Sequence, residues 1–310
     1  MNSQLWQICF LCAALTHLQA AATDISPFSF GVVSPPLRAA SDNVLQKAIK
    51  ESDTNNLAFV VANGIKTFDE ACSDSVYNNR KAQLQGAKNG LVVSLAASDW
   101  TECKDESGKS TAVRKLNHLR ELFFIDEFSL GATKIPVIRQ STTPKFRNFP
   151  ENVRWEMDNI MFATIHLPSN NNHFVFDAGR NSEFEDRSVA NRDWLYRVFT
   201  TATRKKMGGI VLFSDGNPLA RTTGKSSKRD GFVEIRRHLF ALIKKFPGKV
   251  LLIHGRTGQE PKPPAITWRG NLGEVAATVD WLKFNVDASN TAIFSVADKD
   301  SHHRGFQRNR

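Results

Sequence analysis

Short apolar runs rich in β-branched residues recur along the chain, and each predicts a buried strand. They span residues 57–61, 91–95, 160–167, 209–213 and 249–254. Between some of these runs, residues 193–206 and 230–246 place apolar side chains at helical spacing, which predicts two amphipathic helices. Strands that alternate with helices are typical of the α/β class. We therefore expect a layered α/β sandwich with its functional site at the carboxyl ends of the strands.

Residues 1–20 predict a secretory signal peptide. They contain no Asp, Glu, Lys or Arg, and an apolar run leads to the small side chains of Ala20, Ala21 and Ala22. The run is shorter than the roughly 20 apolar residues that cross a bilayer, and a buried N-terminal helix is the alternative interpretation. We expect a secreted, extracellular protein without a transmembrane segment. Its single domain would span residues 21–297, followed by a basic, polar and disordered tail over residues 298–310.

The cysteines agree with export. Removal of the signal peptide takes away Cys9 and Cys12, so Cys72 and Cys103 remain. In an oxidising compartment such an even pair most simply forms one disulfide. Two cysteines are too few for a zinc site built from cysteine. The hydrophobic fraction of 41% is high enough for a sizeable core.

The net charge of +10 bears on the choice of partner. Basic residues gather at Arg204, Lys205, Lys206, Lys225, Lys228, Arg229, Arg236, Arg237, Lys244, Lys245 and Lys249. A positive field attracts nucleic acid, anionic lipid or phosphorylated ligands, although a solvated basic face is the simpler interpretation. No nucleic-acid-binding motif is present, and aromatic residues do not interleave with the charges. We therefore expect an unknown protein or an anionic ligand as the partner.

Common catalytic motifs are missing. Residues 224–226 read Gly-Lys-Ser, as in a P-loop, but Leu219 occupies the position of the first glycine that such a loop needs to cradle phosphate. There is no H-E-x-x-H, G-x-S-x-G or dinucleotide-binding glycine pattern. The acidic residues Glu183, Glu185 and Asp186 are interpreted as a solvated loop rather than a general acid/base pair.

Several segments, in their order along the chain, resemble a known family. They are residues 59–66 (FVVANGIK), 71–74 (ACSD), 94–103 (SLAASDWTEC), 119–131, 149–155 (FPENVRW), 169–171 (SNN), 186–195 and 254–255 (HG). Together they resemble the calcineurin-like metallophosphoesterase superfamily, in particular its secreted branch, over residues 28–296. The resemblance implies the metallo-dependent phosphatase fold and two metal ions that generate a nucleophilic hydroxide. It also implies a cysteine pair placed as Cys72 and Cys103 are.

Most of the metal ligands that the resemblance implies are replaced. Pro35 occupies the position of an acidic ligand, Gly64 that of the metal-bridging aspartate, and Ser98 that of an asparagine ligand. Asp99, next to Ser98, still offers a carboxylate. In the last motif Arg256 places a cation where a metal ion is expected. Because the bridging carboxylate binds both metals, its loss alone is expected to impair two-metal catalysis severely.

These observations predict a secreted phosphoesterase-like pseudoenzyme that binds a partner or an anionic ligand, with no catalytic residue and no metal cofactor. A host-directed effector, delivered into a host cell, is one role that would suit it. The residual pocket is expected to contain Asp99, Asn170, Asp215, His254 and Arg256. Arg256 either holds a phosphate or carboxylate or is an ordinary surface residue. The alternative is a residual phosphoesterase that hydrolyses phosphate esters with one divalent metal ion on Asp99, Asp215 and His254, helped by Asn170.

Overall fold

The computed structural model describes residues 26–38, 43–175, 181–220, 230–255, 264–277 and 280–297. Four features singled out in the sequence lie outside the described residues. They are the predicted signal peptide, the polar tail at 298–310, the Gly-Lys-Ser segment at 224–226, and Arg256.

One sheet combines the first strands of the domain with the last. Its strands are β1 (Phe28–Ser34), β2 (Val60–Asn63), β3 (Leu91–Ser94), β11 (Asp280–Val286) and β12 (Phe294–Val296), in the order β12-β11-β1-β2-β3. The strands β1, β2 and β3 are parallel, whereas β11 runs antiparallel to both β1 and β12. The strand predicted at 91–95 is confirmed as β3, whereas the one predicted at 57–61 is found three residues further along, as β2.

The second sheet is formed by strands from the middle of the chain. Its strands are β4 (Ile138–Arg139), β5 (Val153–Met157), β6 (Ile160–Thr164), β7 (Gly209–Ser214), β8 (Lys249–His254), β9 (Thr267–Arg269) and β10 (Leu272–Ala276), in the order β4-β5-β6-β7-β8-β10-β9. The four central strands β6, β7, β8 and β10 are parallel. The strands predicted at 160–167, 209–213 and 249–254 are confirmed as β6, β7 and β8.

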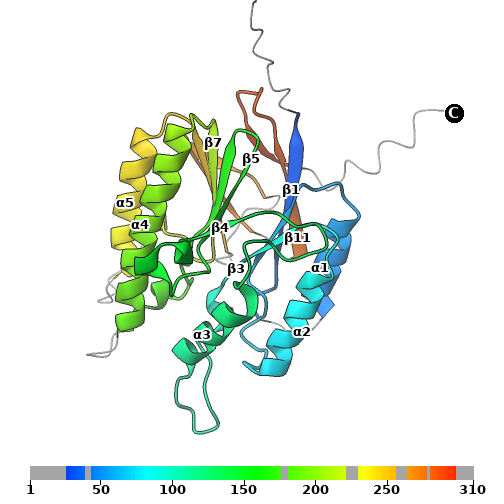
Figure 1. Cartoon of the computed structure of the whole chain (residues 1–310), viewed down its shortest axis with the longest axis vertical. Coiled ribbons are helices and arrows are strands. Elements are labelled where there is room, and N and C mark those ends of the chain that lie inside the picture. The colour runs from blue at the N-terminus through cyan, green and yellow to red at the C-terminus, as the bar shows by residue number, and fades with distance from the viewer. Residues whose placement is uncertain are drawn as a thin grey trace, which may run out of the picture.

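Helices cover the outer faces of the two sheets, which confirms the predicted α/β sandwich. The helices are α1 (Asn43–Asp53), α2 (Asp74–Gln85), α3 (Ala112–Phe123), α4 (Ser182–Arg204) and α5 (Val233–Lys245). Short 3₁₀ turns are η1 (Ala97–Asp99), η2 (Gln140–Thr142), η3 (Pro144–Phe146) and η4 (Asn171–His173). In Figure 1, α1 and α2 lie on one side of the sheets and α4 and α5 on the other. Within the described residues, no helix combines the length and the hydropathy needed to cross a membrane.

The predicted loop around Glu183 is wrong, because α4 begins at Ser182 and includes these acidic residues. Carboxylates are favourable in the first turn of a helix, where they face the positive end of its dipole. Glu183 Oε1 also accepts a 2.6 Å hydrogen bond from Nε of Arg187, one turn further along. The acidic cluster is therefore part of the start of α4 rather than a solvated loop.

An aromatic cluster between the sheets fixes their relative position. The ring of Phe30 on β1 stacks on Phe59 and Phe284, with centroids 5.1 and 5.0 Å apart. The same ring meets Phe162 of β6 and Phe213 of β7 edge-on. Such ring pairs contribute about 0.5–1.5 kcal/mol each beyond the burial of their area. Because the cluster contacts strands of both sheets, it holds the two sheets face to face.

Candidate functional site

The parallel strands of both sheets end in one region, where the loops that follow them contact one another directly. The side-chain amide of Asn63, at the end of β2, donates to the carbonyl of Ser214, at the end of β7, over 3.1 Å. The backbone N–H of Gly255 after β8 donates to the carbonyls of Ser214 and Asp215 at 3.0 and 2.8 Å. We call the region formed by these loops the strand-end site.

Asp99 is fully buried and uses its carboxylate to join two loops. Its Oδ1 accepts backbone N–H bonds from Ile65 and Lys66, at 2.9 and 3.2 Å, in the loop after β2. Its Oδ2 accepts the N–H of Ala96, at 2.8 Å, in the loop after β3. Burial raises the pKa of this carboxyl group to about 6, although these hydrogen bonds and the nearby Lys66 charge act in the opposite direction.

The carboxylate of Asp215, which follows β7, likewise joins its own loop to the loops after β3 and β6. Its Oδ2 accepts the N–H of Ala97 after β3 and the N–H of Ser169 after β6, both at 2.7 Å. Burial raises the pKa of Asp215 as well. Both carboxylates in the strand-end site are therefore occupied by backbone donors of the protein itself.

Small or apolar groups fill the positions at which the resemblance implies metal ligands. Gly64 has a left-handed backbone (φ +88°), and a Cβ atom there would lie 2.9 Å from Cβ of Ala96 and 3.6 Å from Cγ of Pro35. Ser98 is buried within η1. A carboxylate at position 64, which a two-metal centre requires, would not fit without moving its neighbours.

His254 belongs to a separate polar group on the outer side of this region. Its Nδ1 donates to the carbonyl of Gly255 at 2.6 Å, which leaves Nε2 as an acceptor for Nδ2 of Asn217 at 3.2 Å. Oε1 of Glu274 lies 3.4 Å from the same Nε2 and accepts from Asn217 at 2.7 Å. Sequence reasoning missed Glu274, because its strand, β10, was not predicted.

Asp99 and Asp215 thus both accept hydrogen bonds from the loop after β3, whereas the ring of His254 bonds to Asn217 and Gly255. Asn170 is exposed in the loop after β6, and no polar contact within the described residues joins its side chain to the other three. Across the described parts of the chain, no three His, Cys, Asp or Glu side chains are placed to share one metal ion. The residues that the structure describes at the strand ends do not fit a two-metal centre.

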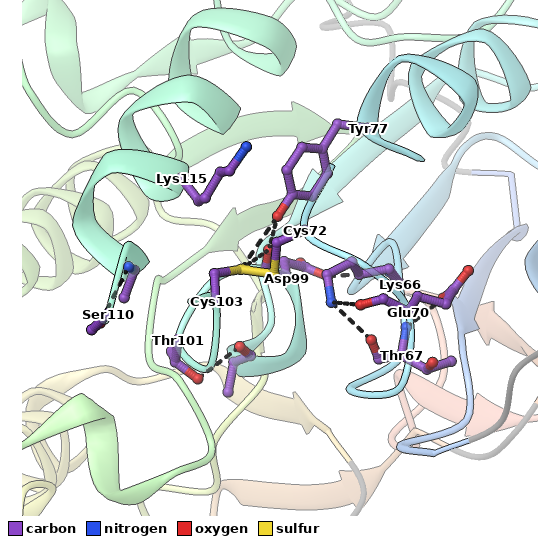
Figure 2. Close-up of a disulfide and its surroundings, with 12 residues drawn as sticks. Lys66, Thr67, Glu70, Cys72, Tyr77, Asp99, Thr101, Cys103, Ser110 and Lys115 are labelled. Carbon is purple, nitrogen blue, oxygen red and sulfur yellow. Dashed lines mark hydrogen bonds between the residues drawn. A yellow bond between two sulfur atoms is a disulfide. The ribbon is translucent and has the colours of Figure 1, made fainter. Parts of the chain in front are cut away.

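The expected disulfide joins the same two loops as Asp99 does. Cys72 and Cys103 are bonded (Figure 2), so the loops after β2 and β3 are linked covalently. The hydroxyl of Tyr77 donates to the backbone carbonyl of Asp99 at 2.8 Å. Nζ of Lys66 is buried nearby and donates to the carbonyls of Thr67 and Glu70, at 2.9 and 3.0 Å. Burial lowers the pKa of Lys66.

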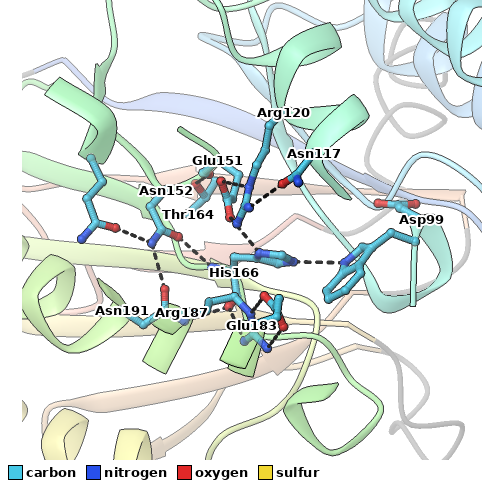
Figure 3. Close-up of polar contacts among 12 residues, drawn as sticks. Asp99, Asn117, Arg120, Glu151, Asn152, Thr164, His166, Glu183, Arg187 and Asn191 are labelled. Carbon is cyan, nitrogen blue, oxygen red and sulfur yellow. Dashed lines mark hydrogen bonds and ion pairs between the residues drawn. The ribbon is translucent and has the colours of Figure 1, made fainter. Parts of the chain in front are cut away.

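A second buried polar cluster lies beside the strand-end site (Figure 3). No sequence motif predicted it. The indole N–H of Trp100 donates to Nε2 of His166 at 3.2 Å, so Nδ1 of His166 carries the proton and donates to Glu151 at 3.0 Å. Arg120 donates to both oxygens of Glu151, at 3.0 and 2.5 Å. Trp100, His166 and Glu151 are each at most 2% exposed. This chain of buried groups links the segment after β3, which carries Trp100, to the segments that flank β5 and β6, which carry Glu151 and His166.

The raised pKa of Asp99 gives a testable pH dependence. The folded protein retains a proton on this group to a higher pH than the unfolded chain does, so the free energy of unfolding should fall by about 3 kcal/mol as pH rises from about 4 to about 6. Asp99→Asn should remove the part of this slope that Asp99 contributes, whereas the part from Asp215, whose pKa burial also raises, should remain. Urea unfolding at pH 4, 5, 6 and 7 measures it, with Glu121→Gln, an exposed change on α3, as the control. An unchanged slope in Asp99→Asn would show that Asp99 is not its source.

Comparisons with known proteins show only distant likenesses. No protein-family model matches the sequence, and no significant match is found among curated proteins. The structure is similar to GAP50, described as the anchor in the inner membrane complex of Plasmodium, with a TM-score of 0.48, 10% identity, and coverage of 88% of this chain and 90% of that chain. It is also similar to TT1561 of Thermus thermophilus, with a TM-score of 0.46, 10% identity, and coverage of 88% and 99%. At these values the likenesses say nothing about the site or its activity.

Proposed function

We propose that this chain is a secreted phosphoesterase-like domain that has lost two-metal catalysis and functions by binding. The ordered sequence segments that resemble the calcineurin-like metallophosphoesterase superfamily support the phosphoesterase-like part. The signal-like N-terminus and the Cys72–Cys103 disulfide support export. A host-directed effector role is a further proposal that export of such a domain would suit.

One observation carries the loss of catalysis. The two carboxylates that remain at the strand ends accept five backbone N–H bonds between them, three on Asp99 and two on Asp215. A metal ion on either oxygen of Asp99 or on Oδ2 of Asp215 would compete with these donors, and each buried N–H left without an acceptor costs about 1–3 kcal/mol. The close packing of Gly64 against Ala96 opposes a bridging ligand independently.

Metal binding and hydrolysis can be tested on the same oxidised protein. We expect titration calorimetry with Mn²⁺ and Zn²⁺ to show no stoichiometric binding. We also expect no hydrolysis of p-nitrophenyl phosphate or bis(p-nitrophenyl) phosphate above the rate in buffer containing metal alone. Asp99→Asn and Asp215→Asn, checked for folding by near-ultraviolet circular dichroism, should behave in the same way. Stoichiometric metal binding together with hydrolysis that both variants lose would instead establish the single-metal phosphoesterase.

A further inference from the structure

The end of α4 carries basic residues that contact strand β5 of the second sheet. Nζ of Lys205 pairs with Oε2 of Glu156 on β5 at 2.5 Å. Arg154 precedes Glu156 by two residues on the same face of this strand, and its Nη1 lies 3.8 Å from Oε1 of the same glutamate. One carboxylate is therefore shared by two cations where α4 meets β5.

Two arginines of α4 add to the positive charge around Arg154. Burial, together with the charges of Arg204 and Arg197, lowers the pKa of Arg154 and outweighs the attraction of the neighbouring glutamate. Arg197 pairs with Asp193, one turn earlier on α4, at 2.6 Å. Within the described residues, no ion pair joins Arg204 to a carboxylate. The guanidinium groups of the strand and the helix therefore repel one another across this contact.

We define the cationic seam as the four basic side chains at this contact, Arg154, Arg197, Arg204 and Lys205. In the part of the chain that the structure describes, their ion pairs reach two carboxylates, those of Glu156 and Asp193. Four positive charges against two negative ones leave two positive charges without a counter-charge. The seam is therefore suited to an anionic partner.

The depth of Arg154 restricts the kind of partner that can reach the whole seam. Its side chain is 16% exposed, whereas those of Arg197 and Lys205 are about half exposed. A group that contacts all of them must project from its own surface into the gap between strand and helix. A carboxylate on a flexible Asp or Glu side chain meets this requirement better than a flat charged surface does.

Exposed apolar side chains flank the seam on both elements. Ile138 of β4 lies directly opposite Arg154 of β5, so the two side chains share one face of the sheet, and Ile138 is exposed. Tyr196, which directly precedes Arg197 on α4, is exposed as well. Arginine and tyrosine are enriched in the energetically dominant parts of protein–protein interfaces. A partner that fits this surface therefore presents apolar side chains next to its carboxylates.

We propose that the cationic seam binds an acidic segment of a partner protein. The inference rests on the proposed function, in which the domain functions by binding, and it names the surface and the chemistry of the partner. Carboxylates of the segment pair with the arginines, because a planar guanidinium donates two parallel hydrogen bonds to one carboxylate. An apolar side chain of the segment contacts Ile138 or Tyr196.

A fluorescein-labelled peptide of glutamate with interspersed leucine is the probe, and the same peptide with glutamine in place of glutamate is its control. We expect fluorescence anisotropy at low salt to show saturable binding of the glutamate peptide alone, weakening as salt rises. Arg204→Gln should weaken binding about threefold and Arg154→Gln about tenfold, because the less exposed arginine is less screened by water. Arg114→Gln, which removes an exposed arginine at the start of α3, is the matched control and should bind like the wild type.

Tyr196→Ser separates the apolar contact from the charge. It should weaken binding of the leucine-containing peptide and leave binding of plain polyglutamate unchanged. Near-ultraviolet circular dichroism checks the folding of Arg154→Gln. The exposed Arg204 has no ion pair among the described residues, so Arg204→Gln provides the test even where Arg154→Gln does not fold.

Three results would overturn the assignment of the seam and leave the proposed function standing. They are absence of peptide binding, equal affinity for the glutamine peptide, and equal weakening in Arg114→Gln. Sedimentation with phosphatidylcholine vesicles that contain phosphatidylserine, abolished by Arg204→Gln and without peptide binding, would assign the seam to a membrane surface instead. Hydrolysis of p-nitrophenyl phosphate by the same preparation would overturn the proposed function itself, whether or not the peptide binds.

Discussion

Removal of the disulfide, in Cys72→Ala/Cys103→Ala, should lower the free energy of unfolding by about 4 kcal/mol. The two cysteines are 31 residues apart in sequence, and the chain-entropy model assigns about this value to closure of such a loop in the unfolded state. The bond also holds together the two loops that Asp99 joins, so its loss should loosen the strand-end site first.

Urea unfolding of the wild type and the double variant, with and without reductant, measures this effect. Reductant should lower the stability of the wild type towards that of the variant and should leave the variant unchanged. A difference below about 1 kcal/mol would show that the hydrogen bonds of Asp99 hold the loops without covalent help.

Glu151→Gln should lower the free energy of unfolding by about 3 kcal/mol, which is the lower end of the range for breaking a buried ion pair. The substitution removes the negative charge that Arg120 faces and leaves this guanidinium, whose side chain is 12% exposed, without a counter-charge. It also replaces one acceptor oxygen by an NH₂ group among donors from Arg120 and His166. Glu127→Gln, an exposed change of the same kind, is the control and should alter stability little.

The pH dependence provides a second measurement on Glu151. Burial disfavours its charged form, but the Arg120 charge and the hydrogen bond from His166 outweigh burial and hold its pKa at about 2. Its stabilising effect is therefore present above its ordinary value of 4.5 and is lost as pH falls towards 2. The wild type should lose stability over this range and Glu151→Gln should lose much less. Equal acid sensitivity of the two proteins would assign the acid transition to other groups.

The central strands could be predicted from the sequence, and the outer ones could not. The runs at 91–95 and 249–254 have both faces covered, so their apolar character is continuous and visible. By contrast, β9 (Thr267–Arg269) is exposed along its length, and its sequence contains no continuous apolar run. The start of α4 was missed because Glu183 and its acidic neighbours resemble a loop in composition, while their partner Arg187 is visible only once the helix is formed.

For the site, the sequence placed two carboxylates at the strand ends but did not show what they contact. Asp99 and Asp215 were expected in the pocket and do lie at the strand ends, yet a sequence does not reveal where backbone N–H groups point. The donors to Asp215 come from Ala97 and Ser169, which are 118 and 46 residues away. Glu151 and His166 form no known motif, because only the antiparallel pairing of β5 and β6 brings them together.

The pairing of β1 with β11 constrains the order in which the domain can assemble. Phe28, near the beginning of the domain, lies opposite Val286, near its end, and Asn63 reaches Ser214 across 151 residues. While the chain emerges from a ribosome or a translocation channel, the edge of β1 that pairs with β11 has no partner. It stays unpaired until nearly all of the domain has emerged. Folding that depends on such distant contacts is slow. A chain interrupted before β11 would thus present an open edge strand, which favours aggregation over a partly folded domain.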